Sequence, residues 1–275
     1  MPAPRRVLIA GAGDLGTRIA ANLRTRGCEV VAIARRPRPA DAGVLALDLT
    51  QAIGDRIADR FDLLVHCLAP AVRDEAGYRA VYIDALQHLL DALPGLHGVA
   101  FVSSTAVYGD HDGGVVDEDS PCRPQRFNGR VLLEGEALAR RGGREALVLR
   151  LGGIYGPGRD LLFRRLRSGE PLAVSDPPQY GNRIQIEDAA AAVAHLLLRG
   201  DHGTFNLVDD DPAGQPEVLD WLADAMQLPR LSRTVAGVAV DNKRVSNARL
   251  RAAGFRLCFP DYRAGYGAML AATRE

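Results

Sequence analysis

The stretch VLIAGAGDLG, residues 7–16, carries three glycines in the spacing GxGxxG directly after a short apolar run. Gly11 permits a tight turn, Gly13 lets the backbone approach a ligand, and Gly16 lets the next helix pack close to the strand. This spacing between a buried strand and a helix predicts a turn that binds the pyrophosphate of a dinucleotide. The alternative is a glycine-rich turn that binds nothing.

The predicted helix after this turn follows Asp14, begins at Leu15 and extends to Arg26, where Gly27 ends it. The first N–H groups of a helix have no partner within the helix, and the helix dipole is positive at that end. Phosphate groups are attracted to such an end. We therefore predict that Asp14 and Leu15, together with the three glycines, bind the cofactor.

Short apolar runs alternate with helix-like segments through the first 151 residues. The runs are continuous rather than alternating, which is typical of strands covered on both faces, as in a parallel sheet. This order predicts an α/β fold with a doubly wound parallel sheet, the Rossmann architecture. The predicted strands are 6–10, 29–34, 44–47, 63–67, 98–103 and 146–151, and the predicted helices are 15–26, 78–93 and 130–141.

The second half of the chain is less regular. A strong helix is predicted over 187–199, a strand over 204–208 and a further helix over 215–227. The proline-rich segment 171–182 is predicted to be a loop.

The end of the second strand indicates which dinucleotide is bound. NAD-binding folds place an acidic residue there, about 20 residues after the turn, to hold the ribose 2′-hydroxyl. This chain has Arg35 and Arg36 instead. Guanidinium groups match the geometry of phosphate, so NADP(H) is the preferred cofactor and NAD(H) is possible. The alternative is that both arginines belong to a solvated loop.

Two more strand ends are predicted at the cofactor side, because open α/β sheets bind ligands at the carboxyl ends of their strands. Asp48 ends the third strand and is expected to accept a hydrogen bond from the adenine amino group. Leu68 and Ala69 follow the fourth strand and are expected to line the ribose. For each residue the alternative is simple loop structure.

Composition excludes several classes of partner. The chain has 34 basic and 34 acidic residues, which disfavours a nucleic acid or an anionic membrane as partner. No apolar stretch approaches the ~18 residues of a membrane span. The four cysteines lie far apart, which predicts free thiols, a cytoplasmic location and no metal site. Lys243 is the only lysine.

Several segments together resemble the extended short-chain dehydrogenases/reductases, the NAD-dependent epimerase/dehydratase group. The segments are VSSTAVYGD (102–110), RLGGIYGPGR (150–159), NRIQIED (182–188), FNLV (205–208) and RVSNARL (244–250). The resemblance implies a Rossmann domain over 1–151, with a contribution from about 183–208. It also implies a smaller substrate-binding lobe, mainly 152–275, and a possible homodimer formed through two long helices.

Members of this group use a Ser or Thr, a Tyr and a Lys. The serine position falls on Ser104, four residues before Tyr108, and Ser103 is assigned to the cofactor site. The Tyr-x-x-x-Lys positions fall on Arg126 and Arg130, so the chain resembles an atypical branch that lacks this pair. Arg130 is expected to hold the nicotinamide ribose, but a guanidinium that stays charged is a poor proton donor.

Two hypotheses follow from this departure. In the first, the protein is an oxidoreductase or epimerase acting on a small carbonyl or sugar-like substrate, with Tyr108 or Tyr155 as candidate acid. For each tyrosine the alternative is a structural side chain packed beside the sheet. In the second hypothesis, the protein binds NADP(H) as a sensor or regulator and performs no turnover.

Overall fold

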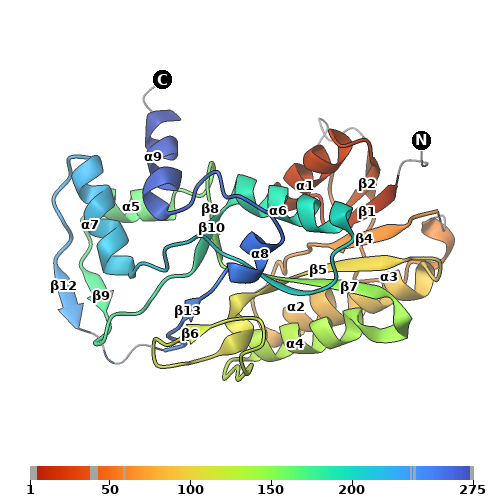
Figure 1. Cartoon of the computed structure of the whole chain (residues 1–275), viewed down its shortest axis with the longest axis horizontal. Helices are drawn as coiled ribbons and strands as arrows, with labels where there is room; N and C mark the ends of the chain where they lie inside the picture. The colour runs from red at the N-terminus through yellow and green to blue at the C-terminus, as the bar shows by residue number, and fades with distance from the viewer. Residues whose placement is uncertain (1–4, 38–42, 58–59, 236, 238–239, 273–275) are drawn as a thin grey trace. The chain divides into compact units, whose positions relative to one another are not determined.

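The computed structural model describes residues 5–37, 43–57, 60–235, 237 and 240–272 (Figure 1). These residues form two compact units. The first unit contains the chain up to Val107, Pro124–Arg150 and Ala190–Phe205, and the second contains Tyr108–Arg123, Leu151–Ala189 and the chain from Asn206 onward. Residues 108–123, which precede the predicted boundary, therefore belong to the second unit.

A seven-stranded sheet confirms the predicted α/β class. Its strands stand in the order β11-β7-β5-β4-β1-β2-β3. Strand β1 pairs in parallel with β2 on one side and with β4 on the other, so the strand order reverses beside β1. The strands are β1 (Arg6–Ala10), β2 (Glu29–Ala34), β3 (Val44–Ala46), β4 (Leu63–His66), β5 (Gly98–Ser104), β7 (Glu145–Leu151) and β11 (Gly203–Leu207).

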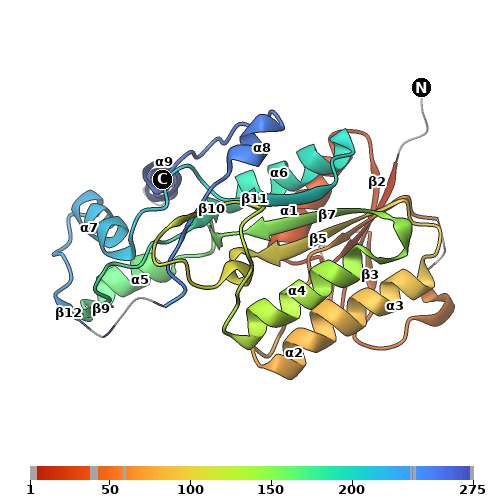
Figure 2. The same cartoon turned by 60° about the horizontal axis from the view of Figure 1, so that its bottom comes forward.

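Helices cover both faces of this sheet, which explains why the strands are apolar throughout. Figure 2 shows α2, α3 and α4 on one face and α1 and α6 on the other. None of the helices in the described ranges is long and apolar enough to cross a bilayer. The helices are α1 (Asp14–Arg24), α2 (Glu75–Arg79), α3 (Ala85–Ala92), α4 (Phe127–Ala139) and α6 (Ile186–Arg199), with short 3₁₀ turns at η1 (Gly54–Arg56), η3 (Thr105–Tyr108) and η4 (Arg141–Gly143).

The single helix predicted over 78–93 is interrupted. A π-helical turn, η2 (Ala80–Asp84), separates α2 from α3, and Ala85 N donates to Ala80 O, five residues earlier. The carbonyl of Val81 instead lies 3.1 Å from Nε2 of His66, a fully buried side chain of β4. Burial lowers the pKa of His66 to about 4, so the ring is neutral and its Nε2–H can donate to this carbonyl. The π-helical turn η2 therefore coincides with a contact between His66 of β4 and the carbonyl of Val81.

The second unit contains three short parallel ladders packed beside helices. Its apolar core includes Tyr155, Phe163, Leu222 and Tyr262. The predicted loop over 171–182 contains a strand, β9, that pairs with β12. The elements are β6 (Val115–Val116) with β13 (Arg244–Val245), β8 (Gly153–Tyr155) with β10 (Arg183–Gln185), β9 (Leu172–Val174) with β12 (Arg233–Val235), and α5 (Leu161–Ser168), α7 (Gln215–Ala225), α8 (Ala248–Ala252) and α9 (Tyr262–Ala272).

A buried ion pair joins α4 to the sheet in the first unit. Glu136 on α4 is 1% exposed and accepts from Arg150 Nε at 3.0 Å and Nη2 at 2.8 Å. The hydroxyl of Ser103 on β5 donates to the same carboxylate at 2.7 Å. The charge of Glu136 is thus compensated by a bidentate guanidinium and a hydroxyl, as a buried carboxylate requires.

We predict that Glu136→Ala lowers the free energy of unfolding by about 3–5 kcal/mol, because it removes the carboxylate that accepts two hydrogen bonds from the buried guanidinium of Arg150. Urea denaturation measures the loss. Glu134→Ala is the matched control on the same helix, because the Arg79–Glu134 pair is exposed and should contribute at most about 1 kcal/mol. Equal losses for the two variants would contradict the prediction.

Candidate functional site

The glycine turn after β1 is closely packed where the sequence predicted it to be. Gly11 has a φ of +110°, which favours glycine, and a Cβ there would lie 2.9 Å from the carbonyl oxygen of Cys67. The amides of Gly11 and Ala12 both donate to the carbonyl of Ile33 on β2, at 3.0 and 2.8 Å. The turn is therefore fixed to the ends of the two strands that flank β1.

The other two glycines differ in what surrounds them. A Cβ on Gly16 would lie 1.9 Å from Gly11 O, so only glycine lets α1 approach the turn this closely. A Cβ on Gly13 would meet no atom within 4 Å. The first helical hydrogen bond runs from Thr17 N to Gly13 O, so the amides of Asp14, Leu15 and Gly16 precede it. This open helix end fits a pyrophosphate group.

The turn lies at the point where the strand order reverses. Ala10 and His66, the last residues of β1 and β4, are partners in the parallel ladder. Gly11 and Cys67 therefore leave the sheet side by side, and Cys67 is followed by the half-buried Leu68 and the exposed Ala69. In open α/β sheets this crevice is where ligands bind.

The residues predicted to select the cofactor occupy neighbouring strand ends. Arg35 and Arg36 follow β2 and are both exposed. Asp48 follows β3 and accepts from the hydroxyl and amide of Thr50, at 2.7 and 3.0 Å. These hydrogen bonds, chiefly the one from the hydroxyl, lower the pKa of Asp48, and the charge of Arg35 lowers it further. Asp48 thus closes a local turn near Arg35, and its contact with adenine stays a prediction.

Comparisons with known proteins agree with this geometry. The NAD dependent epimerase/dehydratase family matches residues 7–207. A protein from Methylobacillus flagellatus, whose structure is described under the same family name, is 35% identical, with 98% of this chain and 99% of that chain covered and a TM-score of 0.85. The chain belongs to the NAD-dependent epimerase/dehydratase family. No curated protein sequence matches it.

Two further structures of this fold are described with bound ligands. MoeE5, in complex with UDP-glucuronic acid and NAD, is 26% identical, with 98% of this chain and 99% of that chain covered and a TM-score of 0.83. The human epimerase family protein SDR39U1, with NADPH, is 23% identical, with 94% and 97% covered and a TM-score of 0.78. The second likeness shows the fold alone.

Two residues that the family resemblance singled out lie near one another in the first unit. Ser104 ends β5, and its Oγ accepts from the amide of Ala106 at 3.2 Å. A Cβ on Gly129 in α4 would lie 2.8 Å from Ala106 O, so the start of α4 packs closely against the turn after Ser104. Arg130 is the next residue, and its guanidinium donates to Gln125 O at 2.5 Å. Gly129 was missed by sequence reasoning, since a single glycine in a helix gives no clear signal.

The other residues assigned by resemblance have contacts inside their own units. The hydroxyl of Ser103 donates its proton in a hydrogen bond to Glu136, and its assignment to the cofactor site stays a prediction. Tyr108 is fully buried, and its phenol donates to Asn206 Oδ1 at 2.7 Å. Tyr155 is 5% exposed, and its hydroxyl donates to Asp261 O at 3.3 Å. These contacts favour the structural alternative for both tyrosines, and their catalytic roles stay predictions.

The only lysine of this family member is structural. Lys243 is 4% exposed, and its Nζ donates to Gly109 O at 2.9 Å and to Asp241 O at 3.0 Å. Burial lowers its pKa from the usual value. The neighbouring Asn242 receives hydrogen bonds from the amides of His111 and Gly113 on its carbonyl. Within the second unit, these two residues thus hold the segment that follows Tyr108 against the segment before β13.

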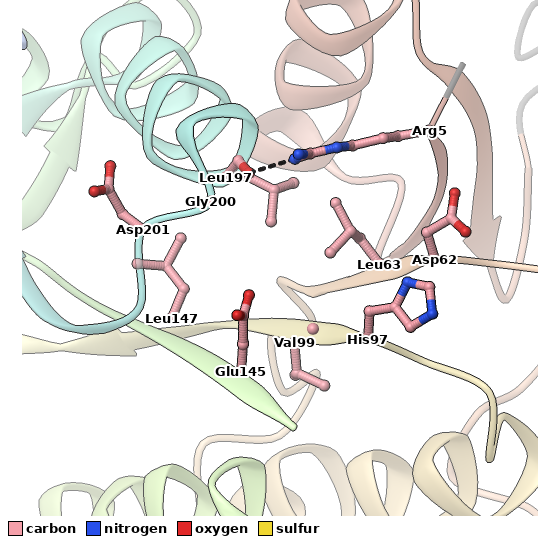
Figure 3. A pocket seen from close by; sticks show the side chains of 11 residues that line it. Arg5, Asp62, Leu63, His97, Val99, Glu145, Leu147, Leu197, Gly200 and Asp201 are labelled. Atoms are coloured by element: carbon pink, nitrogen blue, oxygen red, sulfur yellow. Dashed lines mark hydrogen bonds between the residues drawn. The ribbon is translucent and has the colours of Figure 1, made fainter. Parts of the chain in front are cut away.

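A cavity of about 360 Å³ lies at the amino ends of β4, β5 and β7 (Figure 3). Arg5 reaches toward the end of α6, where its Nη1 donates to Leu197 O at 3.3 Å. None of the sequence-predicted site residues lines this cavity. Among the described residues, no group of three or more His, Cys, Asp or Glu side chains is placed to hold a metal ion.

A buried carboxyl group in the second unit was also missed by sequence reasoning. Asp209 is 3% exposed, and no side chain of the described residues donates a hydrogen bond to its carboxyl oxygens. Burial raises its pKa to about 8, although the charge of Arg183 acts in the opposite direction. Arg183 itself is 8% exposed and donates to Ala213 O at 3.0 Å. Asp209 is therefore largely protonated at neutral pH.

We predict that Tyr108→Phe lowers the free energy of unfolding by about 1–3 kcal/mol, because buried Asn206 Oδ1 loses its donor. Tyr180→Phe, at a 37% exposed side chain, is the control and should change stability by less than about 0.5 kcal/mol. Chemical denaturation measures both. Unchanged stability combined with lost turnover would instead support a catalytic role for Tyr108.

We predict that Asp209 makes the protein less stable as the pH rises from about 4 to about 8. In the folded state the pKa of the Asp209 carboxyl group is about 8, whereas an aspartate in the unfolded chain has its ordinary pKa of 3.8. The folded state therefore binds more protons in this window, and the group lowers the unfolding free energy by up to about 1.4 kcal/mol per pH unit.

Asp209→Asn removes this titration. Denaturation at pH 5, 7 and 9 should show the variant gaining stability relative to the wild type with rising pH, with little further change above pH 8. A difference that is the same at all three pH values would contradict the assignment.

Proposed function

We propose that the glycine turn binds the pyrophosphate of a nicotinamide dinucleotide. The observation that carries this proposal is the contrast between the glycines: Gly16 has no room for a Cβ, whereas Gly13 faces open space at the start of α1. Three amides at this helix end precede the first helical hydrogen bond, and phosphate groups bind at such helix ends. The NAD described with MoeE5 supports a cofactor of this class.

NADP(H) is the preferred form of this cofactor. Arg35 and Arg36 are exposed directly after β2, the position from which NAD-binding folds hold the ribose 2′-hydroxyl with an acidic side chain. Two guanidinium groups at this position would compensate the negative charge of a 2′-phosphate. NAD(H) binding is the weaker alternative.

The activity that fits the family is oxidoreduction or epimerisation of a small carbonyl or sugar-like substrate. The UDP-glucuronic acid described with MoeE5 supports a sugar-like substrate. A nicotinamide cofactor supplies or accepts the hydride when bound. Ser104 would orient the reacting oxygen, and Arg130 would hold the nicotinamide ribose through its guanidinium. Neither residue replaces the phenol of the missing Tyr-x-x-x-Lys pair as a proton donor.

A second function, a cofactor-binding sensor without turnover, is favoured by one specific observation. The phenols of Tyr108 and Tyr155 are both buried and donate to acceptors within the second unit. A panel of carbonyl compounds and nucleotide-sugars, assayed for oxidation of bound NADPH, separates the two functions. Oxidation by any member of the panel supports an enzyme, and tight NADPH binding with no oxidation supports a sensor.

We predict that replacing Arg35 and Arg36 with alanine weakens NADPH binding by about 10- to 100-fold, because charge-assisted hydrogen bonds to the 2′-phosphate are lost. NADH binding should stay within about twofold of the wild type. Fluorescence or calorimetric titration measures both affinities.

Arg26→Ala is the control for this pair, because Arg26 is an exposed arginine that follows α1 and precedes β2. It should leave both affinities unchanged. Equal, weak binding of NADPH and NADH to the wild-type protein would contradict the assignment of Arg35 and Arg36.

A further inference from the structure

A cysteine side chain lies beneath the glycine turn. Cys67 follows β4 directly, and its amide donates to Ala10 O at 2.9 Å, continuing the ladder between β4 and β1. Its Sγ lies 3.3 Å from Gly11 O, the first carbonyl of the turn. The carbonyl oxygen of Cys67 is also the atom nearest to a Cβ built on Gly11, at 2.9 Å. The side-chain sulfur and the backbone carbonyl of Cys67 therefore both lie against the glycine turn.

The same sulfur atom lies beside the third glycine. A Cβ on Gly16 would lie 3.0 Å from Cys67 Sγ as well as 1.9 Å from Gly11 O. The thiol of Cys67, the carbonyl of Gly11 and the α-carbon of Gly16 are therefore packed closely together. Cys67 is half-buried, and a β-branched side chain at this position would put a second atom on Cβ beside the turn and the start of α1, where closely packed groups tolerate added atoms poorly.

The chemistry of the thiol suits a packing and hydrogen-bonding role. Burial raises the pKa of Cys67 to about 12, so the group is a neutral S–H at physiological pH. It can donate a weak hydrogen bond to the Gly11 carbonyl, and it lacks the thiolate that a nucleophile or redox centre needs.

We propose that Cys67 is a positioning residue for the pyrophosphate site, and that the size and S–H donor of its side chain set how closely α1 approaches the glycine turn. This inference rests on the proposed function, because it assumes that the turn binds a dinucleotide. GxGxxG spacing does not include position 67, so the sequence pattern alone assigns it no role.

Three substitutions at this position separate size from hydrogen bonding. Cys67→Val adds a branch at Cβ next to Gly11 and Gly16, and should weaken NADPH binding at least about tenfold. Cys67→Ala removes both the donor and the volume, and should weaken it by about three- to tenfold. Cys67→Ser keeps a donor and is expected to stay within about threefold of the wild type.

A second ligand distinguishes positioning of the turn from general destabilisation. Adenosine 2′-monophosphate carries the 2′-phosphate but no pyrophosphate, so its affinity should be the same in all the variants. Cys28→Val is the matched control: Cys28 is a half-buried thiol of the same unit that precedes β2, and its substitution should leave NADPH affinity within about twofold.

The outcomes are distinct. Loss of NADPH affinity in Cys67→Val, rescue in Cys67→Ser and unchanged binding of adenosine 2′-monophosphate support the proposal. NADPH affinity of Cys67→Val equal to that of the wild type overturns it, as does equal weakening of both ligands. If Cys67→Val does not fold, wild-type affinity in Cys67→Ala overturns it. If the wild-type protein binds neither NADPH nor NADH, the proposed function itself is wrong.

Discussion

The close approach of α1 to the end of β1 is the constraint on which the glycine turn after β1 depends. It requires a glycine at position 16, because a Cβ there would lie 1.9 Å from Gly11 O. The same approach places the first helical amides beside Gly13 and brings Cys67, the residue after β4, into contact with the turn. The role proposed for the two arginines after β2 depends on the same geometry, because they would act on a phosphate of a dinucleotide bound at this turn.

The elements predicted most accurately are those whose signal is local. Strands β1 and β2 have the predicted bounds, because each is an apolar run limited by charged residues or glycine. The π-helical turn η2 escaped prediction because His66, the side chain that contacts the carbonyl of Val81, belongs to β4. Strand β9 was predicted to be a loop because its partner β12 lies far along the chain and its own sequence is short and proline-flanked.

In the candidate site, too, features set by neighbouring residues in the sequence could be predicted, whereas contacts between residues far apart in the sequence could not. The glycine turn could be located from its spacing and Arg35 and Arg36 from their place at a strand end, because these features are local in the sequence, whereas their binding roles stay predictions. The environment of Tyr108 could not, since its hydroxyl bonds to Asn206, 98 residues away in the sequence. Asp209 gave no signal either, because an aspartate in an acidic stretch resembles a solvated loop until its burial is known.

The position of Lys243 has a practical consequence for chemical labelling. Reagents that acylate ε-amines have one target in this chain, and that amine is enclosed and bonded to two backbone carbonyls. Acylation of Lys243 therefore requires the second unit to open, so its rate reports local unfolding there. Covalent attachment to a surface or a dye is better directed to the exposed thiol of Cys258.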